Sequence, residues 1–356
     1  MMKDLRNHSL LHNNTFAIEG RCRRFVEFET KEELLQAIGT LGDDDRRLMI
    51  LGAGSNLLLT KDFEGTVLHS AIGGMQLVGD TAMQPAADAT DGTQAAAASD
   101  EILLRCGSGE KWDDVVAHCV ANGWYGAENL TLIPGDVGAS AVQNIGAYGA
   151  EVKDIVWRVE AVDVHTGEER SFDVAECQYA YRNSIFKRAD HRQWLITYVT
   201  YRLSKRFEPR LDYGNIRSEL QRRGIDSPTA AQLRQCIIDI RRAKLPDPEV
   251  TGNAGSFFMN PVVGREKFVS LEQQYPGMPH YEVSSTEVKI PAGWMIEQCG
   301  WKGKALGRAG VHDKQALVLV NRGGATGSEV LQLCQTIISD VEKKFGVTLR
   351  PEVNIY

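Results

Sequence analysis

The sequence of 356 residues lacks the features that mark secreted, membrane-spanning or nucleic-acid-binding proteins. Its seven cysteines are scattered, odd in number and form no C-x-x-C pair, which favours reduced thiols in a reducing compartment. No apolar run is long enough to span a membrane, and residues 1–18 contain no apolar signal-peptide core. The net charge of −7 argues against a broad nucleic-acid surface. We therefore expect a cytoplasmic protein without a membrane or nucleic-acid partner, whose local basic residues meet any anionic ligand.

Several common ligand-binding motifs are also missing. The eight histidines show no metal-ligand spacing, so we expect no metal site. No G-x-x-x-x-G-K-[ST] segment occurs, and the turn GAGSN at 52–56 lacks the third glycine of a G-x-G-x-x-G turn. Both a P-loop and a classical dinucleotide fold are therefore poorly supported.

Length and apolar periodicity predict two or three domains that mix helices and strands. Residues 130–150 are almost uncharged and rich in Gly, Pro and Ala, which predicts a buried loop, whereas the alanine-rich stretch 79–101 is expected to be a disordered insertion. Prolines after Lys244 suggest a domain boundary there. We predict helices over 32–38, 112–120, 228–244 and 329–345, strands over 48–51, 65–68, 194–203 and 317–320, and a hairpin turning at Thr166-Gly167.

Three glycine turns carry the case for a phosphate-binding site. They are GAGSN (52–56), GSGEKW (107–112) and PGDVGAS (134–140), and strands are predicted between them. Successive backbone N–H groups in such turns can hold a pyrophosphate without cationic side chains. A single turn of this kind most often serves only to reverse the chain, so the case depends on the three together.

Three further segments each allow two interpretations. QNIGAYG (143–149) could bring its main chain close to a flat ring system, or could be a tight buried loop. Arg182 in YRNSIFK is either a surface residue or a planar anion clamp. Arg241 and Lys244 in RRAKLPDP either complement a helix dipole or meet a phosphate or carboxylate.

Two acid–base candidates lie toward the end of the chain. Ser256 in GNAGSFFMNP stands between a glycine and two phenylalanines, so its hydroxyl suits proton donation in a dry site. It could also be an ordinary turn residue, and the nucleophile pattern G-x-S-x-G is absent. Glu352 in RPEVNIY is a functional acid or a solvated edge residue.

These motifs in their order resemble the UDP-N-acetylenolpyruvoylglucosamine reductases, flavoenzymes that complete UDP-N-acetylmuramic acid. The resemblance runs from NTFAI (14–18) to RPEVNIY and includes LGAGSN, LIPGDVGASAVQNIGAYG, YRNSIFK, KLPDP, GNAGSFFMNP, AGWMIEQCGWKG and VHDKQALVLVN. Tyr213 in LDYGN points to the subtype with a substrate-closing tyrosine loop.

The resemblance implies an α+β fold with an FAD-binding region of the vanillyl-alcohol-oxidase (PCMH) type in two lobes and a C-terminal α/β substrate-binding domain. The implied boundaries are 1–72 with the terminal strand 349–356 for the first lobe, 73–245 for the second, and 246–348 for the substrate domain. Noncovalent FAD, NADPH as reductant, UDP-N-acetylglucosamine enolpyruvate as substrate and a role in peptidoglycan synthesis are also implied. We expect a monomer.

The resemblance also assigns site residues. Catalysis would involve Arg182 and Glu352, which stabilise charge on the substrate carboxylate, and Ser256, which protonates the adjacent carbon. The implied cofactor-binding residues are Gly52, Gly54, Ser55, Asn56, Gly109, Pro134, Gly135, Ser140, Asn144, Ile145 and Gly146. The implied substrate-binding residues are Tyr148, Tyr213, Arg241, Lys244, Asn260, Tyr281, Lys302 and Gln315.

One position departs from the family pattern, and two other functions compete with the reductase. Met259 stands where members of the family often carry lysine. A flavin oxidase of the same FAD-binding class is one alternative, although no histidine lies near the glycine turns to link the flavin covalently. A noncatalytic nucleotide-sugar binding protein is the other.

Overall fold

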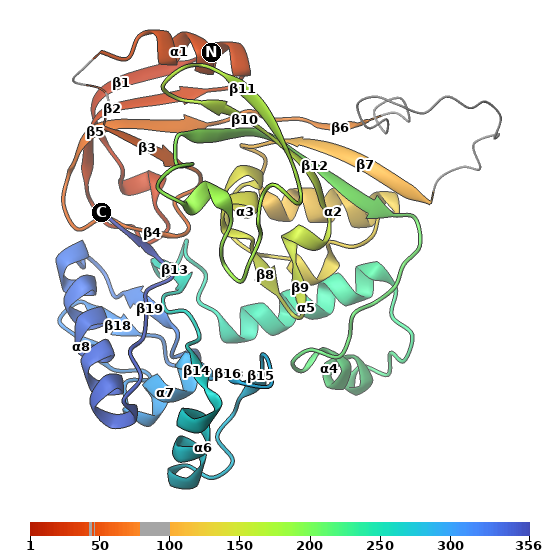
Figure 1. Cartoon of the computed structure of the whole chain (residues 1–356), viewed down its shortest axis with the longest axis vertical. Helices are drawn as coiled ribbons and strands as arrows, with labels where there is room; N and C mark the ends of the chain where they lie inside the picture. Colours follow the sequence, from red (N-terminus) through yellow and green to blue (C-terminus); the bar gives the residue numbers. More distant parts are fainter. Residues whose placement is uncertain (43–44, 46, 79–99) are drawn as a thin grey trace. The chain divides into compact units, whose positions relative to one another are not determined.

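The computed structural model describes residues 1–42, 45, 47–78 and 100–356, which form two compact units (Figure 1). Unit 1 comprises residues 1–5, 25–52 and 66–241, and unit 2 comprises 6–24, 53–65 and 242–356. The predicted insertion 79–101 lies outside the described residues except for Asp100 and Glu101. Glu101 is the first residue of a strand. No helix in the described parts of the chain is long and apolar enough to cross a membrane.

Two sheets form the framework of unit 1. The first has the strand order β1-β2-β5-β3, and the second has the order β11-β10-β12-β7-β6 with antiparallel neighbours throughout. β3 runs parallel to β5, with Leu48 opposite Thr66. The bounds are β1 Lys3–Ser9, β2 Arg21–Phe28, β3 Leu48–Leu51, β5 Phe63–Ser70, β6 Met75–Leu77, β7 Glu101–Gly107, β10 Val156–Asp163, β11 Glu169–Asp173 and β12 Trp194–Ser204. β1, β2 and β5 each continue into unit 2.

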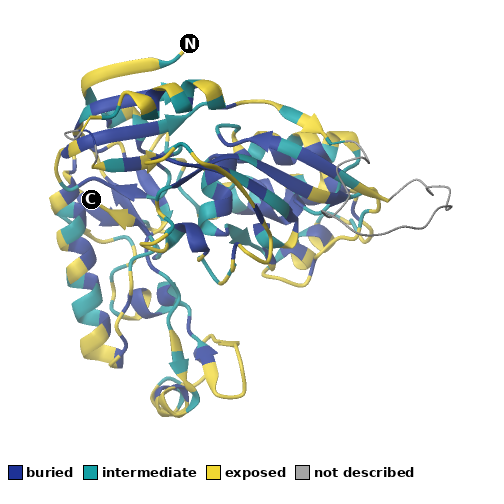
Figure 2. Ribbon diagram, turned by 45° about the horizontal axis from the view of Figure 1, so that its top comes forward, coloured by how far each residue is buried: buried dark blue, intermediate teal, exposed yellow. Residues whose placement is uncertain are grey.

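Helices bury their apolar faces against the second sheet of unit 1. Trp112, Val115 and Cys119 of α2 share a core with Val199 and Tyr201 of β12, and the strands are largely buried (Figure 2). The 112–120 periodicity therefore reports packing on a sheet. The helical bounds are α1 Lys31–Gly39, α2 Trp112–Asn122, η4 Glu128–Leu130, α3 Val137–Gln143, η5 Val152–Asp154 and η6 Ile185–Lys187, and the short strands are β8 Gly146–Ala147 and β9 Ala150–Glu151.

A helical pair with its own apolar cluster completes unit 1. α4 (Ile216–Arg222) packs on α5 (Ala230–Lys244) through Ile216, Leu220 and Ile237, among others. α5 ends at Lys244 as predicted, before the two prolines, and its last three residues belong to unit 2.

Unit 2 contains an antiparallel sheet of order β13-β19-β18-β17 and a smaller sheet of order β14-β16-β15. The long helix α8 begins with a capping box between Thr326 and Glu329 and ends at a left-handed Gly346. The bounds are η1 Leu11–Asn13, β4 Leu57–Leu58, β13 Asn253–Ser256, β14 Val262–Gly264, α6 Arg265–Gln274, β15 Tyr281–Glu282, β16 Glu287–Lys289, α7 Ala292–Gln298, β17 Ala305–Leu306, β18 Ala309–Val311, β19 Val318–Asn321, α8 Gly327–Phe345 and β20 Asn354–Ile355.

The predicted helices, strands and hairpin are confirmed to within a few residues, but the expectation of a loop throughout 130–150 is wrong. Residues Val137–Gln143 form α3, which begins after Asp136 and ends at Asn144 in the left-handed conformation. Ala and Val tolerate a helix, and the missing charges reflect burial instead of irregular structure, since Ser140 and Ala141 are buried. All seven cysteines are free thiols, and six of them are buried.

Candidate active site

Two of the predicted glycine turns are joined by main-chain hydrogen bonds in unit 1. Trp112 N donates to Gly135 O (3.0 Å), Val137 N to Glu110 O (2.9 Å), and Gly138 N to Ser108 O (2.9 Å). The segments 107–112 and 134–140 therefore form one surface of main chain, as an extended cofactor site requires.

The packing of these turns leaves room only for glycine at several positions. A Cβ atom on Gly109 would lie 2.7 Å from Ser70 O, and one on Gly138 would lie 3.0 Å from the Ser108 Cβ. Gly52, at the end of β3, approaches the same region, because its Cβ would lie 3.1 Å from Asp136 Oδ2. Three chain segments thus meet here with their main chains in close contact.

Two polar residues predicted to bind the cofactor have their side chains engaged by protein. The Ser140 hydroxyl donates to Val137 O (2.7 Å) and lies 3.2 Å from the Tyr201 hydroxyl. The Asn144 amide donates to Glu151 Oε2 and Ala180 O, both at 2.9 Å, and its oxygen accepts from Lys153 N. Both residues shape the loop from inside, so the ligand-facing groups of this segment belong to the main chain.

Arg182 docks on the QNIGAYG segment instead of extending over the surface. Its guanidinium donates from Nη2 to Gly146 O (2.6 Å) and from Nη1 to Asn144 O (3.4 Å). The residue is half-buried and adopts a left-handed φ of 54°. Such a conformation costs free energy in a non-glycine residue and is concentrated at functional sites. The structure therefore favours the interpretation of Arg182 as a clamp.

A second guanidinium, that of Arg241, lies near Arg182 and interacts with Tyr148. Arg241 forms a hydrogen bond with the Tyr148 phenol, and burial lowers the pKa of Arg241 while Tyr148 and Asp113 raise that pKa. Arg182 lowers the same pKa because it is a nearby like charge, and Arg241 Nε has no hydrogen-bond partner among the described residues. Burial also raises the pKa of Tyr148, which keeps its phenol protonated. Two cations that repel each other in a half-buried place favour binding of an anion.

The predicted tyrosine loop lies against Tyr148. A Cβ on Gly149 would lie 3.3 Å from the Tyr213 Cβ, and one on Gly214 would lie 3.8 Å from Tyr148 Cδ1. Tyr213 itself is 43% exposed, which is unusual for a large ring and leaves it accessible to a ligand.

In unit 2, Ser256 lies at the exposed end of β13. Gly255 before it is left-handed, with φ +66°, and Phe257 and Phe258 after it are completely or almost completely buried. Phe257 N donates to Leu317 O (2.8 Å). The hydroxyl is therefore presented at the surface by a segment whose next two side chains are anchored in the core.

Glu352 lies beside this serine segment. Its N–H donates to Phe257 O (2.8 Å), and its carbonyl accepts from Asn56 Nδ2 (3.3 Å). The parallel pairing of β20 with β4 continues this contact. The structure thus brings together two predicted catalytic residues and the GAGSN turn, although they are far apart in the sequence.

The GAGSN turn is also held from its other side. Thr15 N donates to Gly54 O (3.2 Å), and the Thr15 hydroxyl donates to Asn253 O (2.7 Å). Gly54 has φ +65°, and a Cβ there would lie 2.0 Å from Asn13 O, so no other residue fits. Ser55, another residue of this turn that is predicted to bind the cofactor, directly follows Gly54.

Three predicted substrate-binding residues lie near the start of α7 or in the small sheet of unit 2. Asn260 Oδ1 accepts from Ala292 N (2.9 Å), and Gln315 Oε1 would lie 3.2 Å from a Cβ on Gly293. Tyr281 pairs in register with Lys289, whose ammonium lies 5.6 Å from the Tyr281 ring centroid.

The last two predicted substrate residues are lysines. Lys302 is ion-paired with Glu297 (2.9 Å), whereas Lys244 is the exposed last residue of α5. Sequence reasoning missed Lys289, for which the alternation in EVKI next to a strand carrying Tyr281 was the available signal. It also missed Asp113 and Asn129, whose roles depend on contacts that no local pattern reveals.

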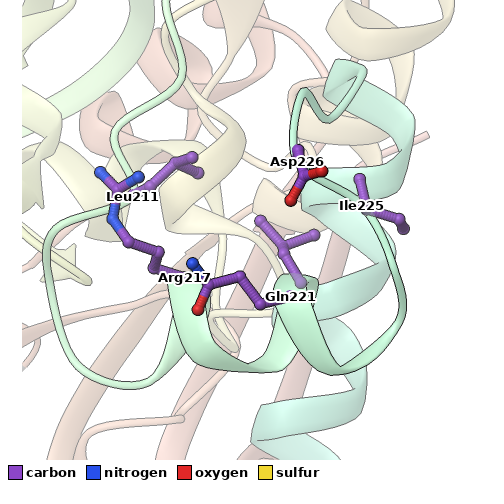
Figure 3. A pocket seen from close by; sticks show the side chains of 6 residues that line it. Leu211, Arg217, Gln221, Ile225 and Asp226 are labelled. Carbon is purple, nitrogen blue, oxygen red and sulfur yellow. The ribbon is translucent and has the colours of Figure 1, made fainter.

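A small pocket in unit 1 is separate from these residues. It is lined by Leu211, Arg217, Leu220, Gln221, Ile225 and Asp226 between α4 and its flanking loops (Figure 3). None of the predicted site residues lines it, so it has no part in the site.

Two family models match parts of this chain. A model described as the UDP-N-acetylenolpyruvoylglucosamine reductase C-terminal domain matches residues 247–356, and one described as an FAD binding domain matches residues 22–173. A UDP-N-acetylenolpyruvoylglucosamine reductase of Bacteroides fragilis (strain YCH46) is 53% identical over 347 residues, which cover 98% of each chain. This chain belongs to the UDP-N-acetylenolpyruvoylglucosamine reductase family. The corresponding Pseudomonas aeruginosa reductase is 43% identical over 357 residues and covers both chains completely.

The fold expected for the reductase family is confirmed. The crystal structure of the UDP-N-acetylenolpyruvylglucosamine reductase from Thermus caldophilus matches 100% of this chain and 99% of that chain, with a TM-score of 0.64 and 21% identity. Together with the matched FAD binding domain, this supports the predicted α+β class with a PCMH-type FAD-binding region and a C-terminal substrate domain.

Proposed function

We propose that this chain uses NADPH and bound FAD to reduce UDP-N-acetylglucosamine enolpyruvate to UDP-N-acetylmuramate, a step of peptidoglycan precursor synthesis. Membership of the reductase family over nearly the whole chain supports the reaction. The structural observation that carries the proposal is the pair of neighbouring guanidiniums, Arg241 at Tyr148 and Arg182 on Gly146 O. An enolpyruvyl group ends in a carboxylate, and planar guanidiniums suit that anion.

The residues present fit a flavin dinucleotide. A Cβ on Gly107 or Gly109 would collide with the main chain of residues 70–73, and one on Gly52 or Gly138 would be crowded by the side chain of Asp136 or Ser108. Glycine at these positions would leave main-chain N–H groups to approach a pyrophosphate. Gly54, Ser55, Asn56, Ile145 and Gly146 are the further residues that we propose for contact with the dinucleotide. Pro134 would limit the flexibility of the same loop. When bound, FAD supplies the redox chemistry, accepting hydride from NADPH and delivering hydride to the enolpyruvyl group.

The residues of this chain would handle charge and protons. Arg182, held by Gly146 O, would stabilise the negative charge that develops on the substrate carboxylate. Ser256 would give its proton to the carbon next to that carboxylate, and Glu352 would assist as an acid or orienting group. A serine hydroxyl is a weak acid, so this step needs the strongly basic carbon of an enediolate-like intermediate.

The nucleotide sugar would be bound by the remaining residues. Tyr148, Tyr213 and Tyr281 offer aromatic rings, Arg241 offers a cation, and Asn260 and Gln315 offer amide groups. Lys302, which is paired with Glu297, and Lys289, beside the Tyr281 ring, are both candidates to meet a phosphate. Lys244 would serve as a further cation.

We also propose the domain boundaries 1–72 with 349–356, 73–245, and 246–348, together with a cytoplasmic monomer. The start of the C-terminal family model at residue 247 supports the boundary after residue 245. Free thiols at all seven cysteines support a reducing compartment.

Stopped-flow absorbance tests the function directly. NADPH should bleach the flavin of the purified protein, and UDP-N-acetylglucosamine enolpyruvate should restore the colour. Failure to bleach, or bleaching without recovery that depends on the UDP-sugar, would rule out the reductase.

A further inference from the structure

Asp113 on α2 uses both carboxylate oxygens to connect two parts of unit 1. Oδ1 accepts from Leu132 N at 2.6 Å, and Oδ2 accepts from Arg234 Nη2 at 2.7 Å. Both side chains of the ion pair are largely shielded, with 27% exposure for Asp113 and 20% for Arg234. A charge-assisted contact of this kind is less screened by solvent than a surface pair.

The first connection, between Asp113 and Leu132, fixes the main chain at the start of the glycine turn. Leu132 has φ +58°, a left-handed conformation that a branched side chain rarely adopts. Its N–H is fixed by Asp113, and Trp112, the preceding residue of α2, donates to Gly135 O (3.0 Å). The start of α2 therefore holds the segment 132–135 at two points.

The second connection, between Asp113 and Arg234, holds α5 against the start of α2. Arg234 and Arg241 are seven residues apart in this helix, so they lie on one face about 10 Å apart along the axis. Arg234 is tied to Asp113, whereas Arg241 forms a hydrogen bond with Tyr148. Asp113 also favours the charged form of Arg241, so its influence reaches the second arginine.

We propose that Asp113 is a positioning residue that connects the glycine turn 132–135 to the arginine-bearing face of α5 and so orients Arg241 toward the anionic substrate. This inference rests on the proposed function, because the anion is the UDP-sugar substrate. Asp113 is assigned no contact with substrate; it acts on Arg241 through its ion pair with Arg234 and through its own charge.

The test compares FAD-loaded variants that separate the two connections. Asp113→Asn keeps an oxygen for Leu132 N but removes the charge that holds Arg234. Arg234→Gln removes the other partner, and Asp113→Ala removes both connections. Asp114→Asn changes the neighbouring exposed carboxylate of α2 and is the matched control.

Two affinities are measured for each variant. Calorimetric titration of the oxidised holoenzyme with UDP-N-acetylglucosamine enolpyruvate gives substrate affinity without turnover, and FAD fluorescence after dilution gives flavin affinity. We expect Asp113→Asn and Arg234→Gln each to weaken substrate binding about tenfold with little change in FAD affinity. The double variant should lose no more than either single variant, because the pair acts as a unit. Asp113→Ala should weaken FAD binding as well, and Asp114→Asn should change neither affinity.

Unchanged substrate affinity in Asp113→Asn would overturn the proposal. Equal losses of substrate and FAD affinity in that variant would also overturn it, because they would indicate a general structural role. The proposed function is judged separately by whether the wild-type protein binds the UDP-sugar and its reduced flavin is reoxidised by that compound.

Discussion

Ser256 combines an exposed hydroxyl with a rigid backbone. Its neighbours Phe257 and Phe258 are anchored in the core of unit 2, and Glu352 donates its N–H to Phe257 O. The register of β13 against β19 shifts between Asn253 and Ser256, and Ser256 is exposed at the end of the strand. The position suits a group that must meet a carbon atom at a defined place.

We expect Ser256→Ala to slow flavin reoxidation by the UDP-sugar about 100-fold or more, the usual contribution of a positioned proton donor. Flavin reduction by NADPH should stay nearly unchanged. Both rates come from stopped-flow absorbance. Equal slowing of the two half-reactions would return Ser256 to a structural role, and unchanged turnover in Glu352→Gln would remove Glu352 from the chemistry.

The close approach of the Arg182 guanidinium leaves no room for a side chain at Gly146. A Cβ at this residue would lie 2.9 Å from Arg182 Nη1 and 2.9 Å from Ala150 O. Gly146→Ala should therefore displace the guanidinium and slow reoxidation about tenfold or more, since a misplaced charge stabilises the transition state poorly. Gly39→Ala, where nothing lies within 4 Å of the new methyl, is the control. A rate equal to that of the wild type would show that Arg182 need not occupy this position.

At the scale of elements, one amide joins the two loops that carry the tyrosines. Asn129 in η4 is 3% exposed and donates from Nδ2 to Tyr148 O (2.8 Å) and to Arg210 O (3.0 Å). Tyr148 needs this support because its φ of 49° is left-handed. The tyrosine loop begins after Arg210, so its base is fixed to the QNIGAYG segment.

Asn129→Asp should release this junction, because a carboxylate cannot donate to two carbonyls. We expect a loss of about 2 kcal/mol or more in the free energy of unfolding, together with faster proteolysis between residues 205 and 214. Urea denaturation and limited trypsin digestion measure the two effects. The exposed Asn122→Asp variant should show neither, and an intact loop in Asn129→Asp would contradict the proposed junction.

The stability of α4 should depend on pH. Hydrogen bonds from Arg222 and then Arg223 lower the pKa of Glu219 to about 2 from an ordinary 4.5. A carboxylate with a lowered pKa stabilises the folded state above the ordinary value and loses that contribution as the pH falls toward the folded value.

We therefore expect Glu219→Gln to have a lower Tm than the wild type at pH 7. The difference should shrink as the pH is lowered through 4.5 toward about 2. Thermal melts followed by circular dichroism give both curves, with exposed Glu208→Gln as control. A difference that stays constant over this range would mean that the ion pairs do not stabilise the folded state.

At the scale of the whole molecule, the glycine segments imply flavin bound by main-chain contacts without a covalent bond. Acid precipitation should therefore leave the yellow colour in the supernatant, with one FAD per chain. Light scattering should give a mass near the 39.4 kDa of a single chain. Flavin that precipitates with the protein would favour the oxidase alternative, and a doubled mass would disprove the monomer.

Much of this protein could be predicted from patterns that act locally. The apolar periodicity of 112–120 and the Thr30 cap of α1 decide local structure, because they depend on neighbours within one or two turns. The ordered motifs also identify the family, because together they extend over nearly the whole chain. The composition of residues 130–150 wrongly predicted a loop throughout. The helix α3 in this stretch is buried and therefore lacks the charged residues that usually mark a helix surface.

The tertiary structure alone decided which residues act together. Ser256 and Glu352 are joined through Phe257 O, and Arg182 rests on Gly146 O, by contacts between segments far apart in the chain. Asp113, Asn129 and Lys289 carry no motif, and their roles follow from long-range hydrogen bonds and strand pairing. Sequence periodicity records how each element faces the core, whereas the partners of a polar side chain depend on which elements the fold brings within hydrogen-bonding distance.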